Sequence, residues 1–123
     1  MTTDALILFA HGARDPRWAE PFVAIVERVR VLSPGRRVEL AFLELMQPSL
    51  PDAVAALVAA GERRITIVPA FLGQGGHIRR DLPVLIDELR TRHAGIELFI
   101  APTLGEVTPV LDAIANFCAE SHC

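Results

Sequence analysis

The order of apolar and polar positions along the chain predicts four buried strands, each followed by a helix. Ala5 to Ala10 form an unbroken apolar run, which is typical of a strand covered on both faces. Crowded apolar and β-branched residues predict three further strands at about Arg37–Leu45, Ile65–Phe71 and Ile96–Ala101. Between these runs, apolar residues recur at the spacing of a helix face. The predicted order of elements is therefore βαβαβαβα.

Capping residues, prolines and glycines mark the helix boundaries. Side chains of N-cap type and first-turn prolines predict helix starts at Asp15–Pro16, Ser49, Asp81–Pro83 and Thr108–Pro109. Glycines that suit the position after a helix predict ends near Gly35, Gly61 and Gly95. The apolar stripe of the last helix consists of Val110, Leu111, Ile114 and Phe117.

Strand–helix alternation of this kind predicts a parallel sheet with helices on both faces and right-handed crossovers. We therefore expect residues 1–123 to form a single doubly wound α/β domain, whose four-stranded parallel sheet has the strand order 2-1-3-4. In such a sheet, ligands bind beyond the carboxyl ends of the strands, where the strand order reverses. That position lies between the first and third strands.

Composition and charge exclude several classes of function. No apolar run approaches the length of about eighteen residues that a membrane helix needs. The N-terminus has no basic segment before its apolar run, so we expect a cytoplasmic protein without a membrane partner. The net charge is −3 with both signs dispersed, which argues against a nucleic-acid partner.

The two cysteines do not indicate a disulfide framework. Cys118 and Cys123 both lie in the last six residues of the chain, so they cannot staple the core. His122 lies between them. These three residues leave two interpretations open: they could bind a metal ion weakly, or they could belong to a C-terminal end without fixed structure.

Three chemically active residues follow the predicted strands at one edge of the sheet. His11 comes directly after the first strand, Glu44 lies near the end of the second, and His77 follows the third strand and the glycine-rich segment Gly73–Gly76. Two imidazoles and a carboxylate suit a divalent transition metal with open coordination positions. The same set could move protons near neutral pH. Glu44 could instead point from the strand end into water.

Ten of the arginines fall into two groups. All twelve basic residues of the chain are arginine. Candidates for binding an anionic ligand flank the two histidine-bearing loops: Arg14, Arg17, Arg79 and Arg80. Those expected to be solvated lie at the opposite edge or at helix ends: Arg36, Arg37, Arg63, Arg64, Arg90 and Arg92.

Three segments of the chain resemble one family of enzymes. The residues HGARDP (11–16) look like the HGSRDP opening of the class II tetrapyrrole chelatases, with Ala13 in place of the usual serine. The residues FLELMQPSLPDAV (42–54) and VPAFLGQGGHIRRDLP (68–83) are similar to that family's second and third segments. The resemblance covers nearly the whole chain. It is strongest to the small, single-domain sirohydrochlorin cobaltochelatases, followed by the sirohydrochlorin ferrochelatases.

The resemblance implies a metal chelatase, a lyase that inserts a divalent metal into sirohydrochlorin in cobalamin or siroheme-type tetrapyrrole biosynthesis. The metal is then a substrate, with cobalt expected first and iron or nickel as alternatives, and no organic cofactor is implied. His11 and His77 match the family's metal-binding histidines, and Glu44 matches its active-site carboxylate. Ala13 removes one hydroxyl but leaves these three residues in place. Larger relatives contain two such domains, so a homodimer is expected.

Two other interpretations of the same residues remain open. A metal carrier or metal sensor could use His11 and His77 without turnover, whereas a pocket wide and apolar enough for a flat macrocycle would favour the enzyme. Gly73–Gly76 before a helix could instead cradle a phosphate of a nucleotide or flavin. The spacing of these glycines matches neither the dinucleotide fingerprint nor the P-loop, which disfavours the phosphate site.

Overall fold

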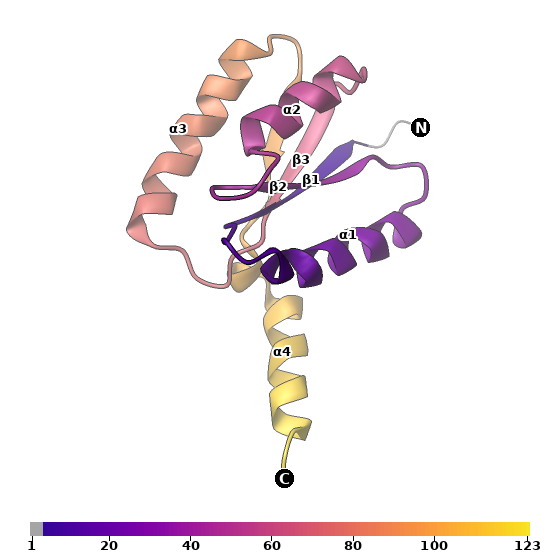
Figure 1. The fold of residues 1–123 in the computed structure, drawn as a ribbon, viewed down its shortest axis with the longest axis vertical. Helices are drawn as coiled ribbons and strands as arrows, with labels where there is room; N and C mark the ends of the chain where they lie inside the picture. Colours follow the sequence, from indigo (N-terminus) through magenta and orange to yellow (C-terminus); the bar gives the residue numbers. More distant parts are fainter. Residues whose placement is uncertain (1–3) are drawn as a thin grey trace.

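The computed structural model describes residues 4–123 (Figure 1), so residues 1–3 of the predicted domain lie outside the described part of the chain. The elements are β1 (Ala5–Ala10), the 3-10 helix η1 (Pro16–Ala19), α1 (Glu20–Leu32), β2 (Val38–Phe42), α2 (Leu50–Ala59), β3 (Arg64–Pro69), α3 (Gly76–Arg92), β4 (Glu97–Ile100), the 3-10 helix η2 (Leu104–Glu106) and α4 (Thr108–Glu120). No helix within residues 4–123 combines the length and the apolar character that crossing a membrane requires.

The four strands form one parallel sheet in the order β2-β1-β3-β4, which confirms the predicted topology. β1 is central, and its Phe9 is aligned with Ala41 of β2 on one side and with Pro69 of β3 on the other. All of β1 is buried because the strand has neighbours on both edges and side chains packed over both faces. The strand order reverses between β1 and β3, so a ligand site is expected at their carboxyl ends.

Two apolar clusters join the sheet to its helices. α2 and α3 cover one face, where Phe9 of β1 packs in a cluster that includes Val54 of α2 and Ile86 of α3. α1 covers the other face through Val26, which packs with Leu8 of β1. Full burial of a side chain of this size contributes about 1.5–3 kcal/mol. These clusters therefore hold the ends of β1 and β3 in fixed positions below the predicted site.

Helix α4 does not pack on the sheet. It leaves the body of the molecule and extends away from it (Figure 1), and none of its residues is buried. The prediction of helices on both faces is correct. Among the described residues, however, α1 is the only helix that packs on the face opposite to α2 and α3. Part of that face therefore lacks a covering helix.

Helix α3 begins at Gly76, so the predicted start at Asp81–Pro83 is wrong. Gly75 is extended and occupies the N-cap position, while Pro83 lies inside the helix. A proline inside a helix removes one backbone donor and favours a break. The helix continues through it because Leu82, Ile86 and Leu89 bury their side chains against the sheet. As a consequence, His77 lies on the first turn of a helix rather than in a loop.

A charged cluster closes the amino edge of the sheet. The Asp4 carboxylate accepts hydrogen bonds from the Thr66 hydroxyl and from Nη2 of Arg36, the latter at 2.9 Å. Arg36 was expected to be solvated, but its side chain is only 20% exposed because it spans this contact. Burial alone would raise the pKa of Asp4; the bonds from Thr66, the backbone and Arg36 outweigh it and lower that pKa below its ordinary value of 3.8.

Replacing Asp4 by asparagine is expected to lower the free energy of unfolding by about 1 kcal/mol at neutral pH. A carboxylate whose pKa is lower in the folded chain stabilises that chain above its unfolded pKa, and this contribution is lost as the pH falls through the folded value. The difference between wild type and Asp4→Asn should therefore shrink once the pH drops below 3.8. Urea unfolding at neutral pH and at about pH 3 measures it, and an equal difference at both values would contradict the assignment.

Candidate functional site

A cavity of about 540 Å³ opens at the carboxyl edge of the sheet. Its walls come from the end of β1, the loops after β2 and β3, and the first turns of α3. The residues that line it are Phe9, His11, Leu43, Glu44, Phe71, Gly73, Gly75, His77, Ile78, Asp81, Leu82 and Leu85. The three residues predicted from the sequence as the site, His11, Glu44 and His77, therefore line one cavity.

The backbones of two neighbouring loops hold His11 against Glu44. Gly12 has a φ of +99°, and a Cβ at this position would lie 1.8 Å from the Glu44 carbonyl oxygen. The Glu44 N–H donates to the His11 carbonyl at 3.0 Å, and Nε2 of His11 lies 2.9 Å from Oε1 of Glu44. Only glycine permits both this backbone angle and this close approach. The backbone contact thus places an imidazole and a carboxylate together.

A turn after β2 directs Glu44 toward the cavity. The strand ends at Phe42, earlier than the predicted end at Leu45, and Leu45 has a φ of +66°. This left-handed conformation is uncommon outside glycine and costs about 1–3 kcal/mol; such strain often occurs at functional sites. The Met46 N–H donates to the Glu44 carbonyl at 2.8 Å and closes the turn. Glu44 therefore contacts His11 instead of pointing only into water.

His77 has a carboxylate partner of its own. Its Nε2 lies 3.1 Å from Oδ2 of Asp81, four residues further along α3. Residues four apart lie on the same side of a helix, so the early start of α3 is what creates this pair. Sequence reasoning missed it because it assigned Asp81 to a helix cap. The signal was present as the spacing His-x-x-x-Asp, which requires a helix that already begins at Gly76.

The cavity thus combines two imidazole–carboxylate pairs with an apolar floor. The rings of Phe9 and Phe71 pack edge to face with their centroids 5.8 Å apart. The rings of Phe71 and His11 also pack edge to face, with their centroids 6.5 Å apart. The side chain of His11 is 47% exposed and that of His77 is 83% exposed. A buried aromatic floor therefore supports polar groups that a ligand can reach.

Each imidazole retains one nitrogen that could bind a metal ion. A carboxylate beside Nε2 favours a proton on that nitrogen and leaves the Nδ1 lone pair available. Within residues 4–123, no group of three or more His, Cys, Asp or Glu side chains is arranged to hold a metal ion, and this includes the cysteines of the C-terminal tail. Two imidazole ligands alone would leave most coordination positions of a divalent ion open, as in sites that exchange a ligand.

The four arginines expected to bind an anionic ligand lie outside the cavity lining. Arg17 pairs with Asp15, with Nη2 and Oδ2 2.8 Å apart, and its hydrogen bonds lower the pKa of Asp15 below the ordinary value. Arg14, Arg79 and Arg80 are exposed and form no ion pair with any residue in the range 4–123. Contact between these arginines and a ligand remains a prediction.

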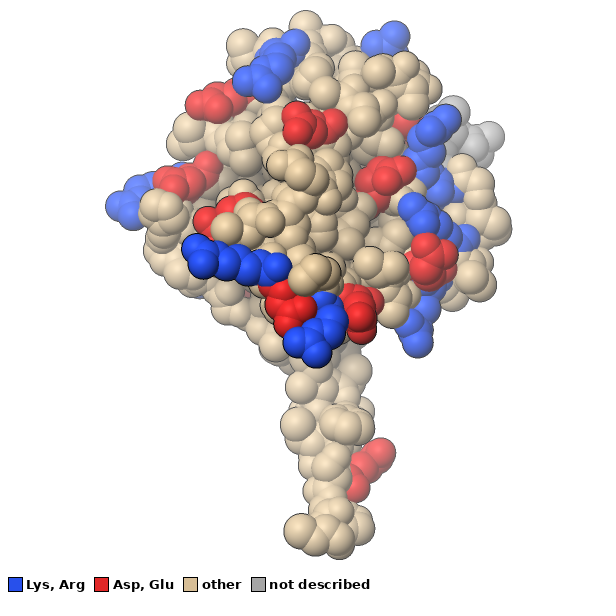
Figure 2. Space-filling view, in the orientation of Figure 1, with Lys and Arg blue, Asp and Glu red and all other residues tan. Residues whose placement is uncertain are grey.

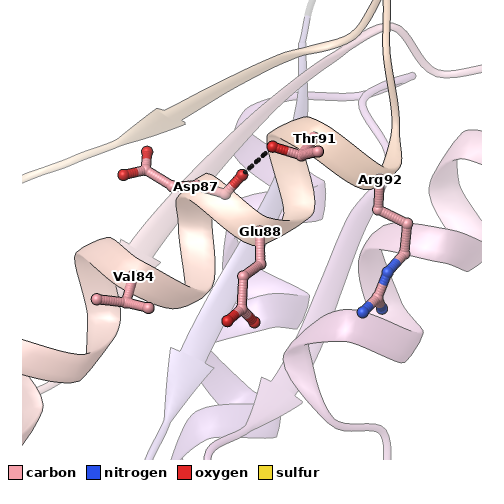
Figure 3. Close-up of a pocket in the computed structure, with 5 residues that line it drawn as sticks. All are labelled: Val84, Asp87, Glu88, Thr91 and Arg92. Carbon is pink, nitrogen blue, oxygen red and sulfur yellow. Dashed lines mark hydrogen bonds between the residues drawn. The ribbon is translucent and has the colours of Figure 1, made fainter.

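A second hollow of about 540 Å³ lies along the outer surface of α3 (Figure 3). Its lining comes from this single helix and consists of Val84, Asp87, Glu88, Thr91 and Arg92. The carboxylates of Asp87 and Glu88 point in different directions, and the Thr91 hydroxyl donates to the Asp87 carbonyl at 3.0 Å. Polar groups do not converge here, so this hollow is a surface depression rather than a binding site.

Fold and cavity together define the class: a doubly wound α/β protein whose histidine–carboxylate cavity lies where the strand order reverses. The family model CbiX matches residues 5–121 of the chain. The chain therefore belongs to the CbiX family.

Curated relatives carry one common name. A sirohydrochlorin cobaltochelatase from Methanocaldococcus jannaschii is 36% identical over 90 residues, which cover 73% of this chain and 63% of that protein. A second, from Methanococcus aeolicus, is 32% identical over 68% of this chain and 58% of its own length. A third, from Saccharolobus solfataricus, is 35% identical over 81% of each chain. This chain thus spans less than two thirds of the length of the first two relatives.

Solved structures share the fold. The structure of a protein described as a cobalamin (vitamin B12) biosynthesis CbiX protein, from Marinobacter aquaeolei VT8, matches with a TM-score of 0.83 and 34% identity over 96% of both chains. The sirohydrochlorin chelatase SirB from Bacillus subtilis subspecies spizizenii, in complex with cobalt, matches with a TM-score of 0.80 and 24% identity. That match covers 97% of this chain and 51% of SirB. The chelatase-like fold expected from the sequence is therefore confirmed.

Proposed function

We propose that this chain is a metal chelatase that inserts a divalent metal ion into sirohydrochlorin, within cobalamin or siroheme-type biosynthesis. The observation that carries the proposal is the cavity in which the His11–Glu44 and His77–Asp81 pairs lie at an apolar floor. The relatives named sirohydrochlorin cobaltochelatase support it. The metal ion and the macrocycle are both substrates, so the reaction needs no organic cofactor.

Cobalt is the metal that we propose first, because the curated relatives are named for it. Iron and nickel are the alternatives, since imidazole nitrogen binds all three divalent ions with intermediate strength. Structures of SirB from Bacillus subtilis have been solved with Fe3+ and with cobalt. A site of two imidazoles therefore calls for a direct comparison of the three metals.

Metal insertion exchanges one divalent ion for two pyrrole protons. The Nδ1 atoms of His11 and His77 would hold the ion beside the ring, while Glu44 and Asp81 orient the imidazoles through Nε2. When the ion passes to the pyrrole nitrogens, the two imidazoles become free to accept the two released protons. A small, open ligand set favours this transfer, because a closed set would retain the metal.

The cavity also suits the macrocycle itself. Leu43, Phe71 and Leu85 give a flat ring an apolar surface on which to lie, with the buried Phe9 beneath them. The carboxylates at the ring's periphery require cationic partners outside this floor. Arg14, Arg79 and Arg80 are exposed close to the two histidine-bearing segments and would supply them through charge-assisted hydrogen bonds. Arg17 would have to exchange Asp15 for the ligand.

Multiple turnover distinguishes this enzyme from a metal carrier or sensor that uses the same two histidines. Purified chain is mixed with an excess of sirohydrochlorin and Co2+, and metallation is followed by the absorbance of the macrocycle. We expect many macrocycles to be metallated per chain, at a rate well above that without protein. Conversion that stops at one equivalent, or no acceleration, would favour the carrier or sensor. Parallel reactions with Fe2+ and Ni2+ give the order of metal preference.

Replacing Glu44 by glutamine is expected to lower kcat by about 10- to 100-fold, with a smaller change in KM for the macrocycle. Glutamine keeps the size of the side chain but loses the charge that orients and supports the His11 imidazole. Glu88→Gln is the matched control, because Glu88 lies in the outer hollow of α3. Steady-state kinetics of both variants measure the effect. Equal rates for the two would make Glu44 a solvated loop residue.

We further propose that the chain acts as a homodimer. The side chains of His77 and Asp81 are 83% and 58% exposed, so the cavity has an open side that a partner could wall. The chain matches 51% of the length of SirB, and two copies would therefore supply the bulk of the longer chain. Two-fold pairing of identical chains is the commonest form of oligomer.

A further inference from the structure

The segment between β4 and α4 lies against the loop that carries part of the aromatic floor of the cavity. The N–H of Gly105, in the 3-10 helix η2, donates to the Phe71 carbonyl at 3.0 Å. A Cβ on Gly105 would lie 1.7 Å from the carbonyl oxygen of Leu72 and 2.6 Å from its carbonyl carbon. Phe71 belongs to the cavity lining, whereas Gly105 lies outside it. Gly105 therefore reaches the cavity through the backbone of a neighbouring loop.

This contact repeats on a second side of the cavity what Gly12 does on the first. Gly12 follows β1 and lies against the Glu44 carbonyl of the loop after β2. Gly105 follows β4 and lies against the Leu72 carbonyl of the loop after β3. In both places a Cβ would overlap a backbone atom, and only a movement of one of the two loops would relieve the overlap. The rim of the cavity thus contains two loop pairs, each closed by one glycine.

The two loop pairs carry different parts of the site. The first pair holds His11 and Glu44, which belong to the proposed metal site. The second pair holds Phe71, whose ring packs on those of Phe9 and His11. An aromatic ring offers the flat apolar surface on which a macrocycle can lie. The second loop pair therefore bears on the binding of the macrocycle.

One side of the Gly105 contact is anchored in the sheet and in η2. The Ala101 N–H donates to the Ile67 carbonyl of β3 at 2.9 Å, and Thr103 is buried. Within η2, the Glu106 N–H donates to the Thr103 carbonyl at 2.9 Å. Hydrogen bonds on both sides of Gly105 therefore resist its displacement.

The other side, which is the loop after β3, has room to move. Leu72 is 65% exposed, and Cβ atoms on the three glycines of residues 73–76 would meet no atom within 4 Å. A Cβ on Gly105 would have to displace the Leu72 carbonyl oxygen by more than about 1 Å before an ordinary contact distance is restored. This displacement turns the peptide unit beside Phe71, and the open glycine segment takes up the rest of the movement before α3 begins.

We infer that Gly105 is a positioning residue for the macrocycle, because it holds Phe71 where the ring of that substrate lies. The inference rests on the proposed function and adds a residue outside the cavity on which substrate binding depends. Glu106 is the only charged residue in the range 101–108, and Figure 2 shows that the projecting helix α4 is largely free of charge. This part of the chain offers no cation to the carboxylates of the macrocycle, so Gly105 acts through position.

Gly105→Ala is expected to raise both the KM and the Kd for sirohydrochlorin by at least about 10-fold. The kcat at saturating macrocycle should stay within about 3-fold of wild type, which is the reverse of the split expected for Glu44→Gln. The multiple-turnover assay with Co2+ gives KM and kcat. Equilibrium dialysis of the metal-free macrocycle gives its Kd without turnover.

Gly95→Ala is the matched control. Gly95 lies between α3 and β4 at the opposite edge of the sheet, has a φ of +88°, and an added Cβ would meet no atom within 4 Å. This variant should lose stability through its backbone angle but bind the macrocycle like wild type. A wild-type Kd and KM in Gly105→Ala would overturn the inference and leave the proposed function standing. A wild-type chain that does not bind the macrocycle would remove both.

A double-mutant cycle shows whether Gly105 acts through Phe71. Phe71→Leu removes the aromatic ring and should itself raise the Kd for the macrocycle. If Gly105 holds that ring in place, adding Gly105→Ala to Phe71→Leu should change the Kd by less than about 3-fold. Full additivity of the two effects would overturn the route through Phe71.

Amide hydrogen exchange of the wild type, measured by NMR, decides the question if Gly105→Ala does not fold. The Gly105 N–H is bonded to the Phe71 carbonyl, so it exchanges with solvent when this contact opens. A macrocycle that rests on Phe71 should slow this exchange by at least about 10-fold at saturation. The reference is the Gly61 N–H, which donates to the Val58 carbonyl at the far end of α2 and should exchange at an unchanged rate. Unchanged exchange at Gly105 would overturn the inference.

Discussion

Replacing either His11 or His77 by alanine is expected to abolish metal insertion and to leave the fold intact. Loss of a residue that only supports a metal ligand lowers activity by about 10- to 100-fold, so loss of an imidazole ligand should lower turnover by more than about 100-fold. The two side chains are 47% and 83% exposed and belong to neither apolar cluster. Little buried apolar surface is lost with them, so the thermal unfolding curve should barely change.

His122→Ala is the matched control for both variants. His122 is exposed after the end of α4, outside the cavity lining, and should be dispensable for turnover. The multiple-turnover assay with Co2+ and sirohydrochlorin measures all three proteins under the same conditions. Wild-type turnover in both His11→Ala and His77→Ala would contradict the mechanism. A variant that unfolds would instead show that its histidine has a structural role.

Gly12→Ala is expected to damage both stability and activity. An added Cβ would lie 1.8 Å from the Glu44 carbonyl oxygen, and φ at this position is +99°. The strained backbone angle costs about 1–2 kcal/mol, and relief of the overlap must move one of the two loops that join His11 to Glu44. We expect a loss of at least about 3 kcal/mol, or on the order of 10 °C in Tm, together with a large fall in turnover.

Gly35→Ala separates the two causes of this effect. Gly35 has a φ of +86°, but an added Cβ there would meet no atom within 4 Å. This control should therefore lose only the cost of the backbone angle, about 1–2 kcal/mol, and should retain its activity. Calorimetry and the chelatase assay of both variants make the comparison. Equal destabilisation of the two would show that the contact between Gly12 and Glu44 is unimportant.

Much of the fold could be predicted because each strand has a clear local signal. The unbroken apolar run Ala5–Ala10 is a central strand, and Ser49 caps α2 as its spacing suggests, with its hydroxyl accepting a hydrogen bond from the Asp52 N–H. The start of α3 could not be predicted, because Pro83 is a local stop signal that packing of the helix overrides. The position of α4 could not be predicted either, since its apolar stripe indicates a contact but not whether the partner belongs to the same chain.

The candidate site could likewise be predicted in part from the sequence. Topology alone brings His11, Glu44 and His77 to one edge, because each follows a parallel strand and carboxyl ends share an edge. Asp81 was missed because its role depends on where α3 starts. The approach of Gly12 to the Glu44 carbonyl was missed because it joins two loops across more than thirty positions of sequence, and no local pattern records such a contact.

The position of bound cobalt would show whether His11 and His77 hold the metal ion. Crystals of the full chain equilibrated with Co2+ would be measured at the cobalt absorption edge, and an anomalous difference map would locate the ion. We expect a peak in the cavity at the carboxyl edge, at coordination distance from imidazole nitrogens of His11 and His77. Cobalt bound only elsewhere, for example by Cys118, His122 and Cys123, with none in the cavity, would contradict it.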